Sequence, residues 1–272
     1  MLALSQRLVI PGIISLILFG LLFYKTDEML SGLGDPAIIS GWALISLMVC
    51  LALINTRKKL VAFNLGRIKN WLAFHIVGGF LAVAIFLLHT GSLFPLGLYE
   101  QILSILFWLV SFTGVWGMVI TMFYPRRLTE DSDTEITYER VPSQIFEIRK
   151  QAEAEVLACT EESGQSTLSQ HYEETLYWFF KQPRFYLNHA IGGEEAFTWI
   201  RRQGKAVERY LNEKETSYLN RIIDLAETKA KTDKHYACQD IMRKWLLVHV
   251  PLSVAVLGMS VWHILLIHVY SS

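Results

Sequence analysis

Four histidines occur in two pairs with the same spacing in this chain of 272 residues. His75 and His89 are fourteen residues apart, and so are His249 and His263. Fourteen residues turn an α-helix through about 1400°, within roughly 40° of four full turns, and advance it about 21 Å. Both histidines of a pair therefore share one face. If two such helices run parallel, His75 lies opposite His249 near one end. His89 then lies opposite His263 near the other, which is a frame for two metal centres.

The residues that precede the two pairs are also alike, since basic residues are followed by Trp-Leu in each. The first copy has Lys69 and Trp71, and the second has Arg243, Lys244 and Trp245. Basic and aromatic side chains are favoured at the membrane–water interface. An ionisable side chain deeper in a bilayer is costly, so a histidine there is by default a functional hypothesis.

Bis-histidine haem iron is the chemistry that this pattern favours. Neutral imidazole is a strong ligand of haem iron, and two imidazoles fill both axial positions, so the iron passes electrons and binds no oxygen. Structural zinc prefers four ligands around one point, whereas the two pairs of facing histidines are about 20 Å apart. A proton relay needs Asp or Glu at membrane depth, and neither stretch has one. Two haems, one near each face, would give electrons a two-step path across the membrane.

The elements that must position these histidines are apolar runs of about 20 residues, the length that spans a bilayer of about 30 Å. Five are present, at Leu8–Tyr24, Ala37–Asn55, Trp71–His89, Gln101–Phe123 and Trp245–Tyr270. Of the 50 charged side chains, 39 lie between Arg126 and Lys244. We therefore expect an all-α polytopic membrane bundle of about five transmembrane helices. Residues 1–125 hold four of them, 126–244 form a soluble, mainly helical insertion, and 245–272 form the fifth, which completes one haem-binding bundle.

Several residues refine this expectation. The first helix is expected to begin near Pro11, and Pro251 is expected to kink the fifth helix near His249. Gly78 and Gly79 leave room beside His75 for either a neighbouring helix or a flat macrocycle. His268 follows His263 by five residues and so points about 140° away on the helix. We expect it at the outer interface, as a hydrogen-bonding residue or part of an exit point for electrons.

Two features of the insertion leave alternatives open. A dense aromatic patch at Tyr177–Phe180 and Phe185-Tyr186 could be a core, a membrane-surface anchor or a docking face. The other three histidines have polar neighbours and no metal-ligand spacing, so we expect surface or capping roles for His171, His189 and His235.

The loop charges predict the orientation, because Lys and Arg accumulate on the cytoplasmic side. The loop between the second and third runs holds five basic residues, namely Arg57, Lys58, Lys59, Arg67 and Lys69. The neighbouring loops, 25–36 and 90–100, hold one between them. The N-terminus and the insertion are therefore expected to be cytoplasmic and the C-terminus outside, in a bacterial inner membrane.

The paired spacing resembles that of the ferric-reductase-like transmembrane cytochromes, which are kin to the membrane part of NADPH oxidases. Their signature is two helices that each bear two histidines with about thirteen residues between them. The resemblance covers the last three apolar runs and implies two b-type haems. It implies that His75 and His249 bind the inner iron, and that His89 and His263 bind the outer iron. Members often carry a flavin- and NADPH-binding domain, but no G-x-G-x-x-G occurs in the insertion.

We therefore expect a cytochrome b subunit that exchanges electrons with a partner protein at one or both faces, or with a quinone pool. The alternative is an oxidoreductase in its own right, which oxidises a quinol or reduces ferric iron or another metal, so the pattern leaves open whether the chain is an enzyme. A non-redox scaffold or transporter, in which the histidines only pack, is a third hypothesis. The bilayer is the other expected partner, and no nucleic acid is expected.

Overall fold

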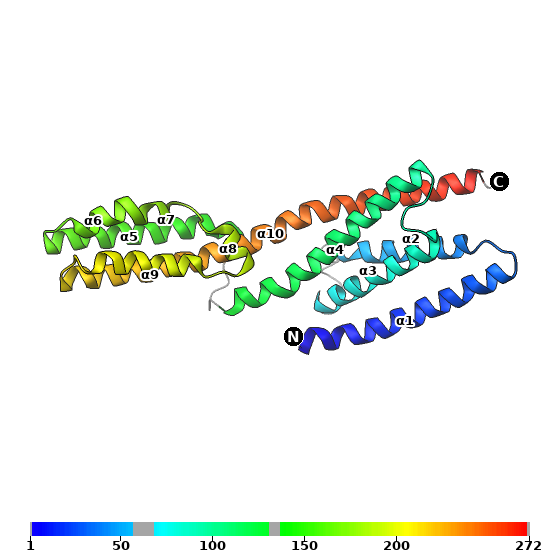
Figure 1. The fold of residues 1–272 in the computed structure, drawn as a ribbon, viewed down its shortest axis with the longest axis horizontal. Coiled ribbons are helices and arrows are strands. Elements are labelled where there is room, and N and C mark those ends of the chain that lie inside the picture. Colours follow the sequence, from blue (N-terminus) through cyan, green and yellow to red (C-terminus); the bar gives the residue numbers. More distant parts are fainter. Residues whose placement is uncertain (1, 57–67, 131–136, 271–272) are drawn as a thin grey trace. The chain divides into compact units, whose positions relative to one another are not determined.

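Every element that the computed structural model describes is a helix. The described residues are 2–56, 68–130 and 137–270, so four basic loop residues, Arg57 to Arg67, and the last two serines lie outside them. The helices are α1 (Leu2–Ser31), α2 (Pro36–Thr56), α3 (Ile68–Thr90), α4 (Leu98–Glu130), α5 (Val141–Ser163), α6 (Thr167–His171), α7 (Tyr177–Lys181), α8 (Tyr186–Ile191), α9 (Glu195–Glu208) and α10 (Glu213–Tyr270) (Figure 1). A 3-10 turn, Tyr138–Arg140, precedes α5, and a π-helical turn, Tyr172–Leu176, joins α6 to α7.

Five of the described helices, α1 to α4 and α10, are long and apolar enough to cross a membrane. The expected all-helical chain with five spans is thus confirmed at this level, and it indicates an integral membrane protein. Two expected boundaries were wrong. α1 begins at Leu2, so Pro11 lies inside it. α10 is one helix of 58 residues that begins at Glu213, well before Trp245. Neither Gly nor Pro occurs between Glu213 and Val250, so nothing in the local sequence ends the helix.

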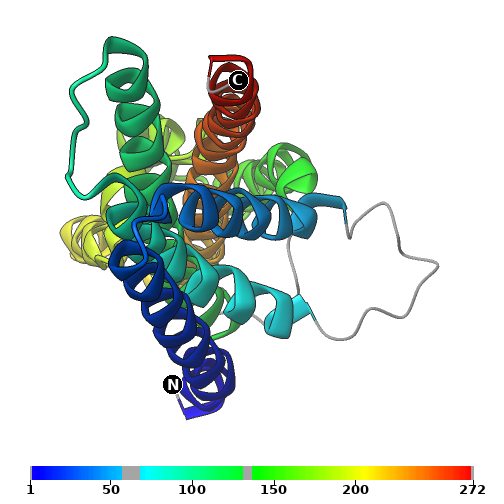
Figure 2. The same ribbon diagram turned by 90° about the vertical axis from the view of Figure 1, so that its right-hand side faces the viewer.

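The chain divides into two compact units, and the first contains the repeated histidines. It comprises residues 1–118 and 245–272. Within it α3 packs against both α1 and α2 (Figure 2). The core lies between α2, α3, α4 and α10, where the rings of Phe86 and Phe107 stack with centroids 4.2 Å apart. Apolar side chains such as Phe112 and Val254 are 68% and 64% exposed, as expected of side chains that face lipid.

The second unit, residues 119–244, is the helical insertion with the adjoining parts of α4 and α10. Its core joins one face each of α5, α9 and the first half of α10, with α6 and α7. The aromatic patch is mainly part of this core, because Phe179 and Phe180 are fully buried. Tyr177 and Trp178 are partly exposed, at 40% and 45%.

Candidate functional site

The repeated stretches of α3 and α10 bring the histidines together in the order that their spacing predicts. The ring centroids of His75 and His249 are 6.4 Å apart, and their planes are nearly perpendicular, at 79°. His89 and His263, each fourteen residues further along its helix, line one cavity. Since the first histidines of both pairs meet and the second histidines share a cavity, these stretches of α3 and α10 run in the same direction.

The tautomer of His75 is set by a backbone group. Its Nδ1 lies 3.1 Å from the carbonyl oxygen of Leu51 on α2. A carbonyl oxygen can only accept, so Nδ1 carries the hydrogen and Nε2 keeps its lone pair. Histidines that bind metals usually donate their other ring N–H in this manner, which fixes the orientation of the ring.

The tautomer of His249 is set by a side chain. Its Nδ1 lies 2.9 Å from Thr113 Oγ1 on α4, and the Thr113 hydroxyl also lies 2.9 Å from the carbonyl oxygen of Val110. Because that hydroxyl donates to the carbonyl, it accepts the hydrogen of His249 Nδ1. His249 therefore also keeps its lone pair on Nε2.

Trp245 supports the same ring from one helical turn earlier. Its indole stacks on the His249 imidazole, with centroids 5.3 Å apart and planes at 22°. The indole Nε1–H donates to the carbonyl oxygen of Thr113 at 2.7 Å. Gly117 makes room for it, because a Cβ there would collide with the indole. One residue of α4 thus holds both rings of α10.

The two glycines beside His75 have different roles. A Cβ on Gly78 would come within 2.7 Å of Leu51 Cδ2, so this glycine allows α3 to approach α2 closely. A Cβ on Gly79 would meet no atom within 4 Å. Close helix packing therefore explains Gly78, whereas Gly79 faces open space.

The inner pair has the donor set and spacing of a bis-histidine haem. A metal–nitrogen bond of about 2 Å on each side puts two axial ring centroids about 6 Å apart, close to the observed 6.4 Å. Both rings are neutral tautomers with Nε2 available as a ligand atom. The residues present therefore fit the group that the sequence pattern implies.

The outer pair is held in a similar way. His89 Nδ1 lies 3.2 Å from Ser40 Oγ, and this hydroxyl lies 2.9 Å from the carbonyl oxygen of Pro36, so Ser40 accepts from the ring. A Cβ on Gly41 would stand 2.9 Å from His89 Cε1, so only glycine leaves room for this ring. The His263 ring stacks with Tyr99, with centroids 6.1 Å apart and planes at 9°.

The cavity between these two histidines has a volume of about 320 Å³. Its lining is mostly apolar and includes two carboxylates, Asp35 and Glu100, but neither Lys nor Arg. His268 also lines it. The expected rotation away from His263 does not remove His268 from the cavity, because the cavity extends from α3 and α4 to α2, where the His268 ring meets Trp42 at 6.1 Å.

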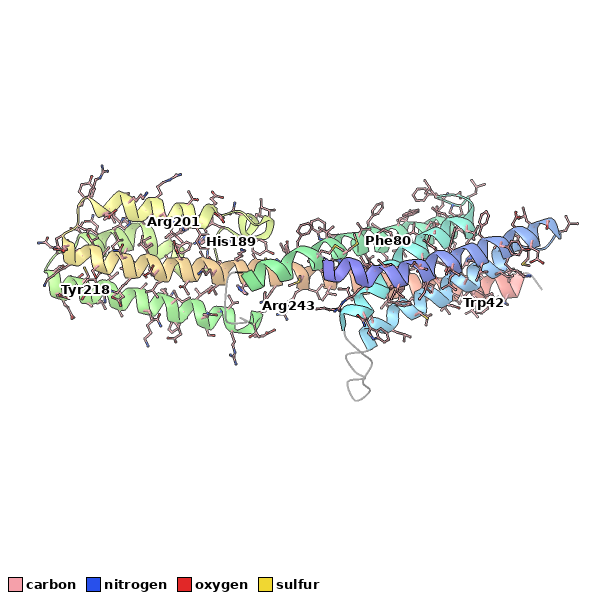
Figure 3. The ribbon with its side chains drawn as sticks, turned by 90° about the horizontal axis from the view of Figure 1, so that it is seen from below. Trp42, Phe80, His189, Arg201, Tyr218 and Arg243 are labelled. Atoms are coloured by element: carbon pink, nitrogen blue, oxygen red, sulfur yellow. The ribbon has the colours of Figure 1, made fainter. Side chains whose placement is uncertain are left out.

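The sequence did not predict a buried polar cluster in the insertion. His189 belongs to this cluster and is fully buried, whereas Arg201 of the same unit lies at the surface (Figure 3). The expected surface role was therefore wrong for His189, and also for His235, which is 3% exposed. Lys229 and Asp233 form a buried ion pair at 2.5 Å. Lys229 Nζ also donates to the carbonyl oxygen of Gln182. Such polar residues in α10 carry no sequence signal that separates them from its solvated face.

Burial also controls the protonation of this cluster. It lowers the pKa of His189 to about 4, an effect that Lys229 and Lys234 reinforce. Neither ring nitrogen of His189 has a hydrogen-bond partner. Burial raises the pKa of Asp233 and lowers that of Lys229, although each is offset in part by the other's charge. Across the described part of the chain, no three His, Cys, Asp or Glu side chains converge as a metal site would require.

No protein-family model, curated protein or solved structure matches this chain.

Proposed function

We propose that this chain is a transmembrane electron-transfer protein that holds two b-type haems, one between His75 and His249 and one between His89 and His263. The observation that supports it most directly is the 6.4 Å spacing of the inner rings, each with Nδ1 engaged. Each ring keeps the lone pair of Nε2, so each has a ligand atom for an iron. The resemblance to ferric-reductase-like transmembrane cytochromes points to the same chemistry, and we infer kinship to them on that ground.

A haem bound by each pair of histidines would supply one-electron transfer at that site. The protein's part is to hold the ligands and to exclude water. The Leu51 carbonyl and the Thr113 hydroxyl fix the inner rings, and the Ser40 hydroxyl fixes His89. Hydrogen bonds from Nδ1–H make an imidazole a more basic ligand, which favours the ferric state. With two histidines as ligands, each site would transfer electrons and would bind no gas.

We further propose that the protein lies in a bacterial inner membrane with the insertion on the cytoplasmic side. The charge of the loop that precedes α3 supports this orientation. A redox partner protein would then meet the insertion or the inner end of the bundle.

The pyridine haemochrome content of the purified protein tests the assignment. We expect two haem b per chain and a reduced-minus-oxidised spectrum typical of bis-histidine cytochromes. His75→Ala should leave one haem per chain, and so should His263→Ala, whereas His171→Ala in the insertion should leave two. Retention of the second haem in each variant reports that the bundle still folds. A purified protein without a Soret band would refute the proposal and favour a scaffold.

A further inference from the structure

The short helix α8 exposes two large apolar side chains on one face. Leu187 and Ile191 are each 76% exposed, and they lie four residues apart, so they project from the same side of the helix. His189 lies on the opposite side and is fully buried in the insertion. Single apolar side chains at a protein surface are common. Two neighbouring ones on a helix whose other side is buried instead indicate contact with an apolar medium or partner.

The backbone around α8 holds this face outward. Phe185, the residue before the helix, has a φ of +54°, a left-handed conformation that is strained for a bulky side chain. Such strain persists only where the surrounding contacts fix the backbone. Here the Arg184 N–H donates to Asp233 Oδ2 at 3.0 Å, and Gly192 ends the helix with a φ of +84°. The outward direction of the exposed face is therefore built into the fold of the insertion.

α8 packs beside the turn of α10 that precedes its apolar stretch. The Tyr186 hydroxyl donates to Asp240 Oδ2 at 2.7 Å, and Lys244 Nζ lies 5.3 Å from the centre of the Tyr186 ring. Lys244 is followed directly by Trp245, where the apolar run begins, and α10 is one continuous helix through this point. Basic and aromatic residues at the start of an apolar span mark the membrane surface. The part of α10 that α8 contacts is therefore the part that meets this surface.

The charged and aromatic side chains around α8 also suit a lipid headgroup region. Lys181 lies over the Tyr177 ring at 6.0 Å, and Arg184 lies over the Trp178 ring at 4.2 Å. Trp178 is 45% exposed and contacts the Phe185 ring, which precedes α8. Basic side chains attract anionic lipids, and Trp and Tyr favour the boundary between hydrocarbon and water. Aliphatic side chains next to such groups are typical of a segment that lies in the membrane interface.

We propose that the exposed face of α8 inserts into the headgroup region of the membrane that α10 crosses, with Leu187 and Ile191 at the edge of the hydrocarbon. The inference goes beyond the proposed function and does not depend on the haems. It gives the insertion an attachment to lipid in addition to α4 and α10. The occupant is lipid, because α8 contacts the turn at which α10 enters its span. A second copy of the chain and another protein are outcomes that the test distinguishes.

Nitroxide labels at the exposed positions test this in the whole chain, in nanodiscs of phosphatidylcholine and phosphatidylglycerol. Leu187→Cys and Ile191→Cys each carry one label, in a Cys50→Ser background because Cys50 is exposed. Oxygen collects in hydrocarbon, whereas a nickel chelate stays in water. Leu157→Cys on α5 is the matched control, since Leu157 is 65% exposed. The ratio of oxygen to chelate collisions should be at least about tenfold higher for the α8 labels, because transfer of a polar chelate out of water is costly.

Hydrogen exchange gives a second measurement that needs no label. The N–H groups of His189 and Gly193 close α8 with hydrogen bonds of 2.8 Å. In nanodiscs they should exchange at least about tenfold faster in the double variant Leu187→Asn, Ile191→Asn than in the wild type. Burial of even one aliphatic side chain is worth about that factor in the opening equilibrium. Leu157→Asn, the same kind of change on α5, should leave the exchange of α8 unaltered.

Collision ratios that are equal for the α8 labels and the α5 label would overturn the inference. Equal exchange of α8 in the wild type and the double variant would also overturn it. Dipolar broadening that disappears when labelled protein is diluted with unlabelled protein would identify a second copy as the occupant and would refute the contact with lipid. A chain without haem should give the same results for α8, so failure of the proposed function is recognised separately.

Discussion

Thr113 offers the sharpest test of how the inner site is built. Replacement by Val keeps the shape of the side chain but removes the hydroxyl that accepts from His249 Nδ1 at 2.9 Å. The partner of that hydroxyl within α4 is a helical carbonyl, which keeps its place in the helix ladder. The imidazole alone thus loses a hydrogen bond and becomes a less basic ligand. The ferric state should then lose more stability than the ferrous state.

The size of the effect follows from one hydrogen bond. If the bond favours the ferric state by about 1 kcal/mol, its loss raises the midpoint potential by about 40 mV, since a tenfold change corresponds to about 59 mV for one electron. We expect this rise in the inner haem alone, as measured by spectroelectrochemical titration.

Two variants serve as controls for Thr113→Val. Thr113→Ser keeps the hydroxyl and should match the wild type. Ser111→Ala removes a nearby hydroxyl on α4 that donates to the carbonyl oxygen of Phe107, and it should also leave both potentials unchanged. Two haems with unaltered potentials in Thr113→Val would show that this contact does not tune the site.

Three further predictions concern other parts of the chain. Gly41→Ala should remove or displace the outer haem only, because its Cβ would stand 2.9 Å from the ring of His89. The haemochrome count checks this. Gly20→Ala is the control and should keep both haems, because a Cβ there meets nothing within 4 Å. Lys229→Met or Asp233→Leu alone should each cost about 3–5 kcal/mol by leaving one buried charge unpaired. The double variant should be at least as stable as either in thermal unfolding, and a lower stability would contradict the argument. The pKa of His189 is lowered to about 4, so below pH 6.5 the unfolded chain binds this proton first and about 3 kcal/mol of stability is lost by pH 4. His189→Leu should remove this loss in melts from pH 7 to 4, and because the raised pKa of Asp233 acts in the opposite direction, the variant should gain stability over the acid part of that range.

The sequence predicts the helical spans well because each rests on a local property. Apolar length determines the spans, and a spacing of fourteen residues puts both histidines of a pair on one face of any regular helix. The partners of the imidazole Nδ1 atoms could not be predicted, because Leu51, Thr113 and Ser40 come from other helices. Their identity depends on how α2 and α4 pack against the histidine helices. No local motif indicates which residues these partners are.

Predictions were wrong for His189 and for the start of α10, because a local pattern does not show how helices pack. Assignment of His189 to the surface followed from its polar neighbours, but its burial is decided by the packing of α8 in the insertion. The expected start of a helix at Trp245 followed the change from charged to apolar residues. The charged residues suit water and the apolar residues suit lipid, but both can be helical. α10 therefore continues through this point, because its backbone hydrogen bonds form with either kind of side chain.

The hydrogen bond of His75 differs from the others in what natural variation can do to it. Its acceptor is a main-chain oxygen at Leu51, which no single-base change can delete, whereas the acceptor for His249 is a hydroxyl that one codon change removes. Drift can therefore adjust the inner site through one of its two histidines. At the inner site the other histidine stays anchored in every descendant that keeps α2 beside α3.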